Sequence, residues 1–164
     1  PVYHRIPTYG YKFSEKQQSL NIKKESISQY QLSIEEIKHI KSGQDIQRED
    51  QVIRFQDCTT GSDALRTYTY CADSRIEEDL IPIAEGSDLL YFETTYMHDL
   101  QKQARERGHA TSIEAATLAK KANVKKLITG HYSSRYKDVQ PLVDEARTVF
   151  DNVIMGYDGV VVRL

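Results

Sequence analysis

The sequence predicts an α/β protein in which helices flank a layered sheet. From residue 67 onward, short β-rich runs alternate regularly with helical patterns, and this alternation is typical of α/β layers. The 164 residues are 39% hydrophobic and 28% charged, which suits one domain with a buried core. No apolar run approaches the ~20 residues of a membrane span, and no secretory leader opens the chain. We therefore expect a soluble, cytoplasmic protein and no membrane partner.

The first element is expected to be a strand over residues 3–13. Tyr9, Tyr11 and Phe13 alternate there with small or polar residues, and this period of two is the pattern of a strand. The chain starts at Pro1 without a methionine and enters strand-like sequence at once, so we expect it to be a piece of a longer protein.

A polar, glutamine-rich arm over residues 14–50 follows this strand. Its best ordered piece is predicted to be a short helix over residues 33–40. Ser33 and Glu36 have the S-x-x-E spacing of a capping box, and isoleucines recur every three residues behind it. We expect residues 1–164 to form a single domain that carries this arm as an insertion.

The remaining elements follow from the switch between a period of two and a helical period. In chain order they are a weak strand with a turn at 59–63 within 51–66, a strand at 67–72, a helix at 76–84, a strand at 88–92, helices at 97–107 and 112–122, a strand at 126–129, a helix at 139–150, and strands at 153–155 and 160–163 around a turn at 157–159.

Charge is distributed unevenly, although 22 basic and 24 acidic residues leave a net charge of only -2. Residues 100–137 hold nine lysines and arginines against two glutamates, so the rest of the chain is acidic. A basic band can attract a polyanion, but it can equally be a solvated helix face. The two cysteines, Cys58 and Cys71, do not make a disulfide framework and are expected to be reduced core thiols.

Polar side chains stand where several predicted strands end. Asp73, Glu93 and His131 follow predicted strands, and His109 stands just before the predicted helix at 112–122. Ligands of open α/β sheets bind beyond the carboxyl ends of the strands, so these side chains are expected to converge. Two carboxylates and two imidazoles are typical of a metal-assisted hydrolase, although each residue alone could be an ordinary turn or loop residue.

The segment after His109 adds an anion-binding feature. Thr111 and Glu114 have the T-x-x-E spacing of a capping box, which places a helix N-terminus beside His109. Free backbone amides at such a terminus bind anions such as phosphate. A histidine in that position is well placed to act as a general acid.

These residues resemble ribonuclease Z, or tRNase Z, a metallo-β-lactamase-fold endonuclease that trims the 3' ends of precursor tRNA. The resemblance covers nearly the whole chain and corresponds to the C-terminal half of the family. It rests on His4-Arg5-Ile6-Pro7-Thr8-Tyr9-Gly10-Tyr11, Tyr70-Cys71-Ala72-Asp73-Ser74, Phe92-Glu93-Thr94-Thr95, Gly108-His109-Ala110-Thr111, His131-Tyr132-Ser133-Ser134-Arg135-Tyr136 and Asp158-Gly159.

The resemblance implies a mixed sheet with flanking helices, one half of an αββα sandwich, and a site with two zinc ions in the complete protein. It implies that His4, Asp73 and His131 ligate metal. His109 would donate the proton to the leaving oxygen and Glu93 would pair with it. We add Arg135 and Thr111 as contacts to substrate phosphate. Precursor tRNA would be the substrate, and the complete protein a homodimer.

Three departures from the family pattern qualify this prediction. The metal motif H-x-H-x-D-H is absent from these residues, so we expect the isolated chain to be inactive and to bind zinc weakly or not at all. Phe92 stands where the family has histidine. The arm lacks the family's glycine-proline element and holds six basic against seven acidic residues, so we do not expect a strong tRNA clamp.

Two alternatives remain open from the sequence. The same metal ligands would serve a hydrolase of small phosphodiesters or sulfate esters. The chain could also be a structural half without catalytic activity of its own.

Overall fold

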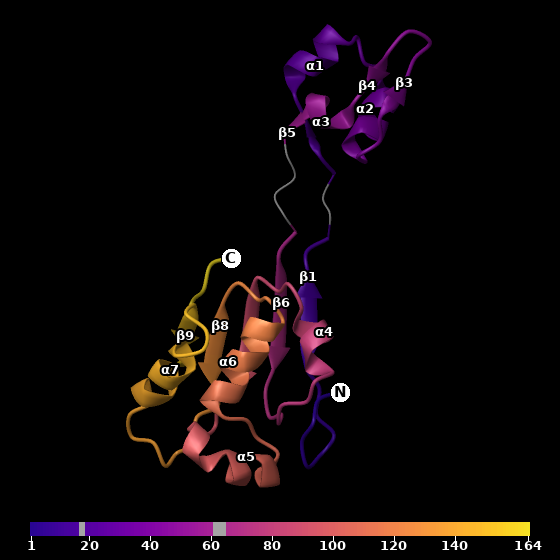
Figure 1. Ribbon diagram of the computed structural model, residues 1–164. Helices are drawn as coiled ribbons and strands as arrows, with labels where there is room; N and C mark the ends of the chain where they lie inside the picture. Colours follow the sequence, from indigo (N-terminus) through magenta and orange to yellow (C-terminus); the bar gives the residue numbers. More distant parts are fainter. Residues whose placement is uncertain (17–18, 61–64) are drawn as a thin grey trace. The chain divides into compact units, whose positions relative to one another are not determined.

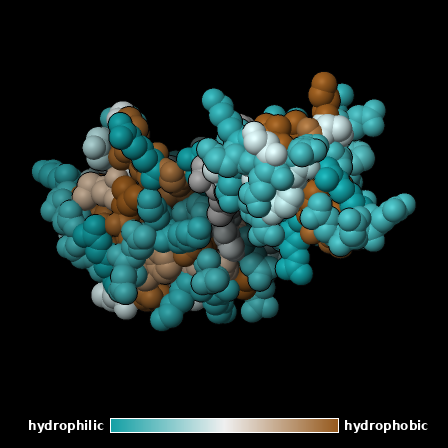
Figure 2. Space-filling view, turned by 90° about the horizontal axis from the view of Figure 1, so that it is seen from above, coloured by the Kyte–Doolittle hydropathy of each residue, from teal (hydrophilic) through white to brown (hydrophobic). Residues whose placement is uncertain are grey.

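The computed structural model describes residues 1–16, 19–60 and 65–164, and it divides into two compact units. One unit comprises residues 1–14 and 66–164, and the other comprises residues 15–65. Hydrophilic and apolar side chains are interspersed on the face that Figure 2 presents, as expected for a chain with 28% charged residues. Among the described residues, none of the helices combines the length and apolarity that a membrane crossing requires.

The larger unit is built on a five-stranded mixed sheet (Figure 1). Its strand order is β1 (Tyr11–Ser14), β6 (Thr67–Cys71), β7 (Leu89–Glu93), β8 (Leu127–Gly130) and β9 (Val153–Met155). The first strand runs antiparallel to β6, and the other three pairs are parallel. The predicted mixed sheet is therefore confirmed.

Helical connections join the parallel strands, because a parallel pair cannot be closed by a tight turn. They are α4 (Leu80–Ala84) between β6 and β7, then η1 (His98–Leu100), α5 (Gln101–Arg107) and α6 (Ser112–Lys121) between β7 and β8, and α7 (Gln140–Arg147) between β8 and β9. Figure 1 shows α4, α6 and α7 in front of the sheet.

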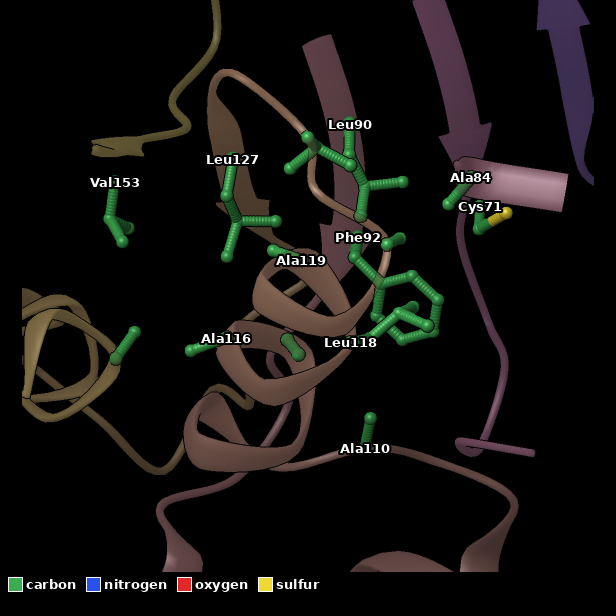
Figure 3. Close-up of a cluster of buried hydrophobic side chains, with 14 of the residues drawn as sticks. Cys71, Ala84, Leu90, Phe92, Ala110, Ala116, Leu118, Ala119, Leu127 and Val153 are labelled. Atoms are coloured by element: carbon green, nitrogen blue, oxygen red, sulfur yellow. The ribbon is translucent and has the colours of Figure 1, made fainter. Parts of the chain in front are cut away.

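The core lies between the sheet and α6. Leu90, Phe92 and Leu127 point from the strands toward α6, whose small residues Ala116 and Ala119 admit them (Figure 3). Small side chains on the helix let it approach the large side chains of the strands closely, as close packing requires. This packing fixes the start of α6, and with it the segment that carries His109.

The other face of the sheet carries aromatic and aliphatic side chains. Tyr70 and Tyr91 stack with ring centroids 4.9 Å apart, and they line a hollow of about 780 Å³ together with Tyr68, Ile128 and part of the segment after β9. Burial raises the pKa of the Tyr91 hydroxyl to about 12. This face is therefore apolar up to the edge where the polar site begins.

The smaller unit has a core of its own, which the polar composition of the arm did not predict. It contains α1 (Lys24–Gln29), α2 (Ile34–Lys41) and α3 (Phe55–Cys58), with the antiparallel pairs β2 (Asn21–Ile22) with β5 (Thr59–Thr60) and β3 (Ile46–Gln47) with β4 (Val52–Ile53). Ile40, Ile46 and Ile53 are buried together there. The predicted capping box of α2 is present, with Glu36 N donating to Ser33 Oγ and Ser33 N donating to Glu36 Oε2.

Three predicted elements differ from the structure. The strand expected over 3–13 is confined to β1, because the chain turns back on itself before it and Val2 bridges Thr8. The helix expected over 76–84 begins only at Leu80, since Pro82 has no amide to donate and is tolerated only in a first turn. Residues 160–163 form no strand. The turn expected at 59–63 lies partly outside the described residues.

Candidate active site

Four metal-ligand side chains converge at the carboxyl ends of the parallel strands. Among the described residues, Asp73, Glu93, His109 and His131 each offer a ligand atom, and these atoms all lie within 4.8 Å of one another. The strand register explains the convergence, because Cys71 pairs with Phe92 and the strands therefore end at the same level. The structure thus brings together the three residues selected from the predicted strand ends and His109, which was selected by its place before a helix.

Two of these residues sit at sharp backbone turns. Asp73 and His131 have φ values of 49° and 55°, in the left-handed region that Asp and His tolerate better than most residues. Strained conformations of this kind are often found at functional sites. The turn points both side chains across the strand ends, and Nε2 of His131 lies 2.8 Å from Oδ1 of Asp73.

Glu93 is fully buried and is the hydrogen-bond acceptor at the centre of the site. It accepts from the backbone amides of Ser74 at 2.5 Å and Ala110 at 3.1 Å, from the Thr95 hydroxyl at 2.6 Å, and from Nδ1 of His109 at 3.1 Å. Four donors occupy the lone pairs that a carboxylate offers. Glu93 is therefore an organising carboxylate and has little capacity left to bind a metal.

The hydrogen bonds assign the same tautomer to three histidines. Nδ1 of His109 contacts Glu93, Nδ1 of His4 lies 2.9 Å from the Gly108 carbonyl, and Nδ1 of His131 lies 2.9 Å from Oγ1 of Thr95. A carbonyl or carboxylate oxygen can only accept, and the Thr95 hydroxyl already donates to Glu93, so each Nδ1 carries the proton. Each Nε2 is then the atom left to bind a ligand or transfer a proton.

The tautomer of His131 has a consequence for its contact with Asp73. With the proton on Nδ1, the Nε2 lone pair of His131 faces a carboxylate oxygen only 2.8 Å away. Two acceptors at that distance need a proton or a cation between them. A nitrogen and an oxygen donor are also what zinc prefers, so the chemistry of this pair fits a metal ion.

His4 comes from the N-terminal segment and lies at the end of a row of imidazoles. Its ring centroid is 5.1 Å from that of His109, which is in turn 5.4 Å from that of His131. The group of four ligand atoms within 4.8 Å does not include His4. Its assignment to metal stays a prediction, and its ring lies beside that of His109.

Three of the amides around the start of α6 already have partners within the chain. Ala110 N donates to Glu93, Thr111 N donates to Glu114, and Ser112 N donates to the Tyr96 carbonyl. The prediction of free amides is wrong for these three groups, because a buried carboxylate, the capping box and the Tyr96 carbonyl satisfy them. The Thr111 hydroxyl takes part in the same capping box and is fully buried, so its contact with substrate stays a prediction.

Two residues at this site were not found from the sequence. Tyr96 is buried between Arg135, whose guanidinium carbon lies 4.9 Å from the ring centroid, and Arg107, which donates to the Tyr96 hydroxyl at 3.2 Å. The basic band over residues 100–137 was the available signal, but it did not distinguish Arg107 from its neighbours.

Burial raises the pKa of the Cys71 thiol to about 11, so Cys71 is a neutral thiol near pH 7.

Comparison with known proteins agrees with this geometry. No protein-family model matches the chain. Ribonuclease Z of Parabacteroides distasonis is 41% identical over 160 residues, which are 97% of this chain and 53% of that protein. Ribonuclease Z of Porphyromonas gingivalis strain W83 is 40% identical over 155 residues, 94% of this chain and 51% of that protein. The chain is related to ribonuclease Z. It spans about half the length of the curated relatives that it matches.

Solved structures confirm the predicted fold class. A metallo-β-lactamase fold protein of Bacillus subtilis, YhfI, matches with a TM-score of 0.51 and 32% identity over 55% of this chain and 36% of that one. A long-form RNase Z from yeast matches with a TM-score of 0.51 and 28% identity over 57% of this chain and 13% of that one. Phe92 stands where the resemblance to ribonuclease Z implies a histidine. Its side chain is buried in the core and makes no contact that Glu93 needs.

Proposed function

We propose that this chain supplies part of the active site of a zinc-dependent endoribonuclease that removes 3' trailers from precursor tRNA. The observation that carries the proposal is the His109–Glu93 pair beside the His131–Asp73 pair. The ring centroids of His109 and His131 are 5.4 Å apart. Similarity to ribonuclease Z over 97% of the chain supports the choice of substrate.

The metal ligands in this proposal are His4, Asp73 and His131. All three offer nitrogen or oxygen donors. Hydrogen bonds from Nδ1 orient both imidazoles and leave Nε2 as the ligand atom, as is usual for zinc-binding histidines. Bound zinc would activate a water molecule and polarise the phosphate oxygens. A dinuclear centre needs more ligands than these, and the resemblance assigns them to the H-x-H-x-D-H motif, which these 164 residues lack.

His109 acts as the general acid in this proposal. Its Nδ1–H donates to Glu93, so the proton that leaves for the 3' oxygen must come from Nε2 of the imidazolium. The Glu93 carboxylate is fully buried and stabilises that imidazolium, as well as holding the ring in position. A buried, fully hydrogen-bonded carboxylate cannot swing away, which keeps Nε2 aimed into the site.

The remaining parts of the proposal concern the protein as a whole. We propose that the chain is inactive alone and that residues 1–164 form one domain with residues 14–50 as an inserted arm. We also propose that the complete enzyme is a cytoplasmic homodimer. Arg135, exposed beside the site, would contact substrate phosphate.

The test uses a full-length protein in which these residues follow a segment with the H-x-H-x-D-H motif. Precursor tRNA labelled at its 5' end is incubated with this protein, with and without a chelator, and the products are sized on a gel. Cleavage at the start of the trailer that needs zinc supports the proposal. A folded protein loaded with zinc that leaves the trailer intact would contradict it, and so would cleavage by the 164-residue chain alone.

A further inference from the structure

The strongest feature outside the metal and proton-transfer groups is a pair of arginines on one buried tyrosine. We infer that Arg107 and Arg135, organised by Tyr96, form a binding site for a phosphate group of RNA next to the scissile phosphodiester. This inference rests on the proposed function, because it assumes that the bound polyanion is the RNA being cut.

The backbone holds Tyr96 rigidly beside His109. Tyr96 N donates to the Ala110 carbonyl at 3.3 Å, Ser112 N donates to the Tyr96 carbonyl at 3.0 Å, and Tyr96 forms a parallel bridge with Thr111. Its ring meets that of His109 edge-on, with centroids 6.2 Å apart. Tyr96 is therefore fixed to the segment that carries His109, and whatever it positions is positioned relative to the reaction.

Tyr96 uses both parts of its side chain to orient a cation. The ring face supports Arg135, whose guanidinium carbon lies 4.9 Å from the centroid. The hydroxyl, at the far end of the ring, accepts from Nη1 of Arg107 at 3.2 Å. Stacking and one hydrogen bond occupy little of either guanidinium, since each has five N–H donors.

The charges of these two arginines are not balanced internally. Among the described residues, neither Arg107 nor Arg135 forms an ion pair with a carboxylate, whereas Arg105 on the same helix lies 3.8 Å from Glu77. Both side chains are exposed, so their remaining donors face solvent. Two guanidinium groups that Tyr96 orients, each with free N–H donors, can both donate to the oxygens of one phosphate. Arginine commonly binds phosphate with two parallel hydrogen bonds.

The ligand is inferred to be a phosphodiester for reasons of charge and position. The site lies in the basic band over residues 100–137, with nine basic and two acidic residues, while the chain as a whole has a net charge of -2. A polyanion would therefore be drawn to this region in preference to the rest of the surface. Because Tyr96 is fixed beside His109, a phosphate held here would place its neighbour in the strand near the proton donor.

Binding is measured on the 164-residue chain with a short, fluorescently labelled polyuridine strand, in a chelator so that no cutting occurs. Anisotropy titrations at several salt concentrations give the dissociation constant and its salt slope. We expect R107A and R135A each to weaken binding roughly tenfold. Each should also reduce the magnitude of the slope by about 0.7, the value for one lost phosphate contact on a single strand. The control R105A, whose charge faces Glu77, should change neither quantity.

A third variant tests the organising role of the tyrosine. Y96F keeps the ring under Arg135 but removes the oxygen to which Arg107 donates. Y96F should weaken binding, add nothing to the effect of R107A, and add fully to the effect of R135A. Thermal melting of every variant, with unchanged midpoints for R107A and R135A, shows that lost binding is not lost structure.

The outcomes separate this site from the proposed function. If R107A and R135A bind as well as R105A, or if R105A, R107A and R135A all lose binding equally, the site does not exist. If R107A and R135A behave as expected while the full-length protein cuts no precursor tRNA, the phosphate site stands and the proposed function is wrong. If the full-length protein cuts and both variants bind normally, the proposed function stands and this inference is wrong.

Discussion

Replacing Glu93 by glutamine tests whether this buried carboxylate organises the site. Glu93 Oε1 accepts from Ser74 N and His109 Nδ1, and Oε2 accepts from Ala110 N and the Thr95 hydroxyl. Glutamine must place its NH₂ group at one of these two oxygens. Whichever way the amide turns, it therefore faces a backbone N–H, and two donors come into contact.

The cost follows from the number of bonds lost. One backbone hydrogen bond to a charged acceptor contributes about 1.5–3 kcal/mol, and a buried donor left unsatisfied costs about 1–3 kcal/mol. We expect Glu93→Gln to lower the free energy of unfolding by about 3 kcal/mol, which shifts the melting temperature by roughly 6–12 °C in a chain of this size. The side chain is fully buried, so solvent does not reduce the effect.

Urea unfolding of the 164-residue chain, followed by circular dichroism, measures this free energy. Glu78→Gln is the matched control, because Glu78 is exposed and should change stability by less than 0.5 kcal/mol. A loss below about 0.5 kcal/mol for Glu93→Gln would show that the backbone amides do not depend on the charge, and would refute the organising role.

Four further predictions concern other groups. In the full-length protein, His131→Ala should lower zinc content and cleavage together, whereas His109→Ala should keep its zinc and lose roughly 10²- to 10⁴-fold in rate. Metal analysis and single-turnover cleavage assays measure both effects, and an empty metal site in His109→Ala would contradict the assignment. The 164-residue chain alone should lose its zinc on dialysis against a chelator, and stoichiometric zinc that survives dialysis would count against a weak site. Hydrogen bonding and charge from Lys125 hold the pKa of Asp88 below its usual range. The stabilisation that Asp88→Asn removes should therefore be present near neutral pH and vanish as the pH falls through that lowered pKa. If the urea midpoints of the wild-type chain and Asp88→Asn differ equally at pH 7 and pH 3, this prediction is wrong. Phe92→Ala should cost about 3–5 kcal/mol of unfolding free energy by opening a cavity under α6, and an unchanged urea midpoint would exclude that packing.

Local patterns in the sequence were sufficient for the main elements of the larger unit. The strands expected at 67–72, 88–92, 126–129 and 153–155 are present as β6 to β9 with ends that differ by one residue at most. Both predicted capping boxes are present as well. These features depend on residues a few positions apart, where periodicity and cap chemistry act directly.

Convergence of the site residues could also be predicted, because the rule that ligands bind beyond strand ends needs only strand positions. Asp73, Glu93 and His131 were found in this way, and His109 by its place before a capped helix. Their individual roles could not be read from position. Only the hydrogen bonds distinguish Glu93, whose lone pairs are filled, from Asp73, whose side chain is partly exposed.

The sequence by itself thus determined the alternation of elements, the helix caps and the group of polar residues at the strand ends, because each depends on neighbours along the chain. The tertiary structure alone decided that the amides before α6 are occupied, that the glutamine-rich arm has its own core, and that Tyr96 joins Arg107 to Arg135. The physical reason is that each of these contacts joins residues that lie on different elements, and their meeting depends on how those elements pack.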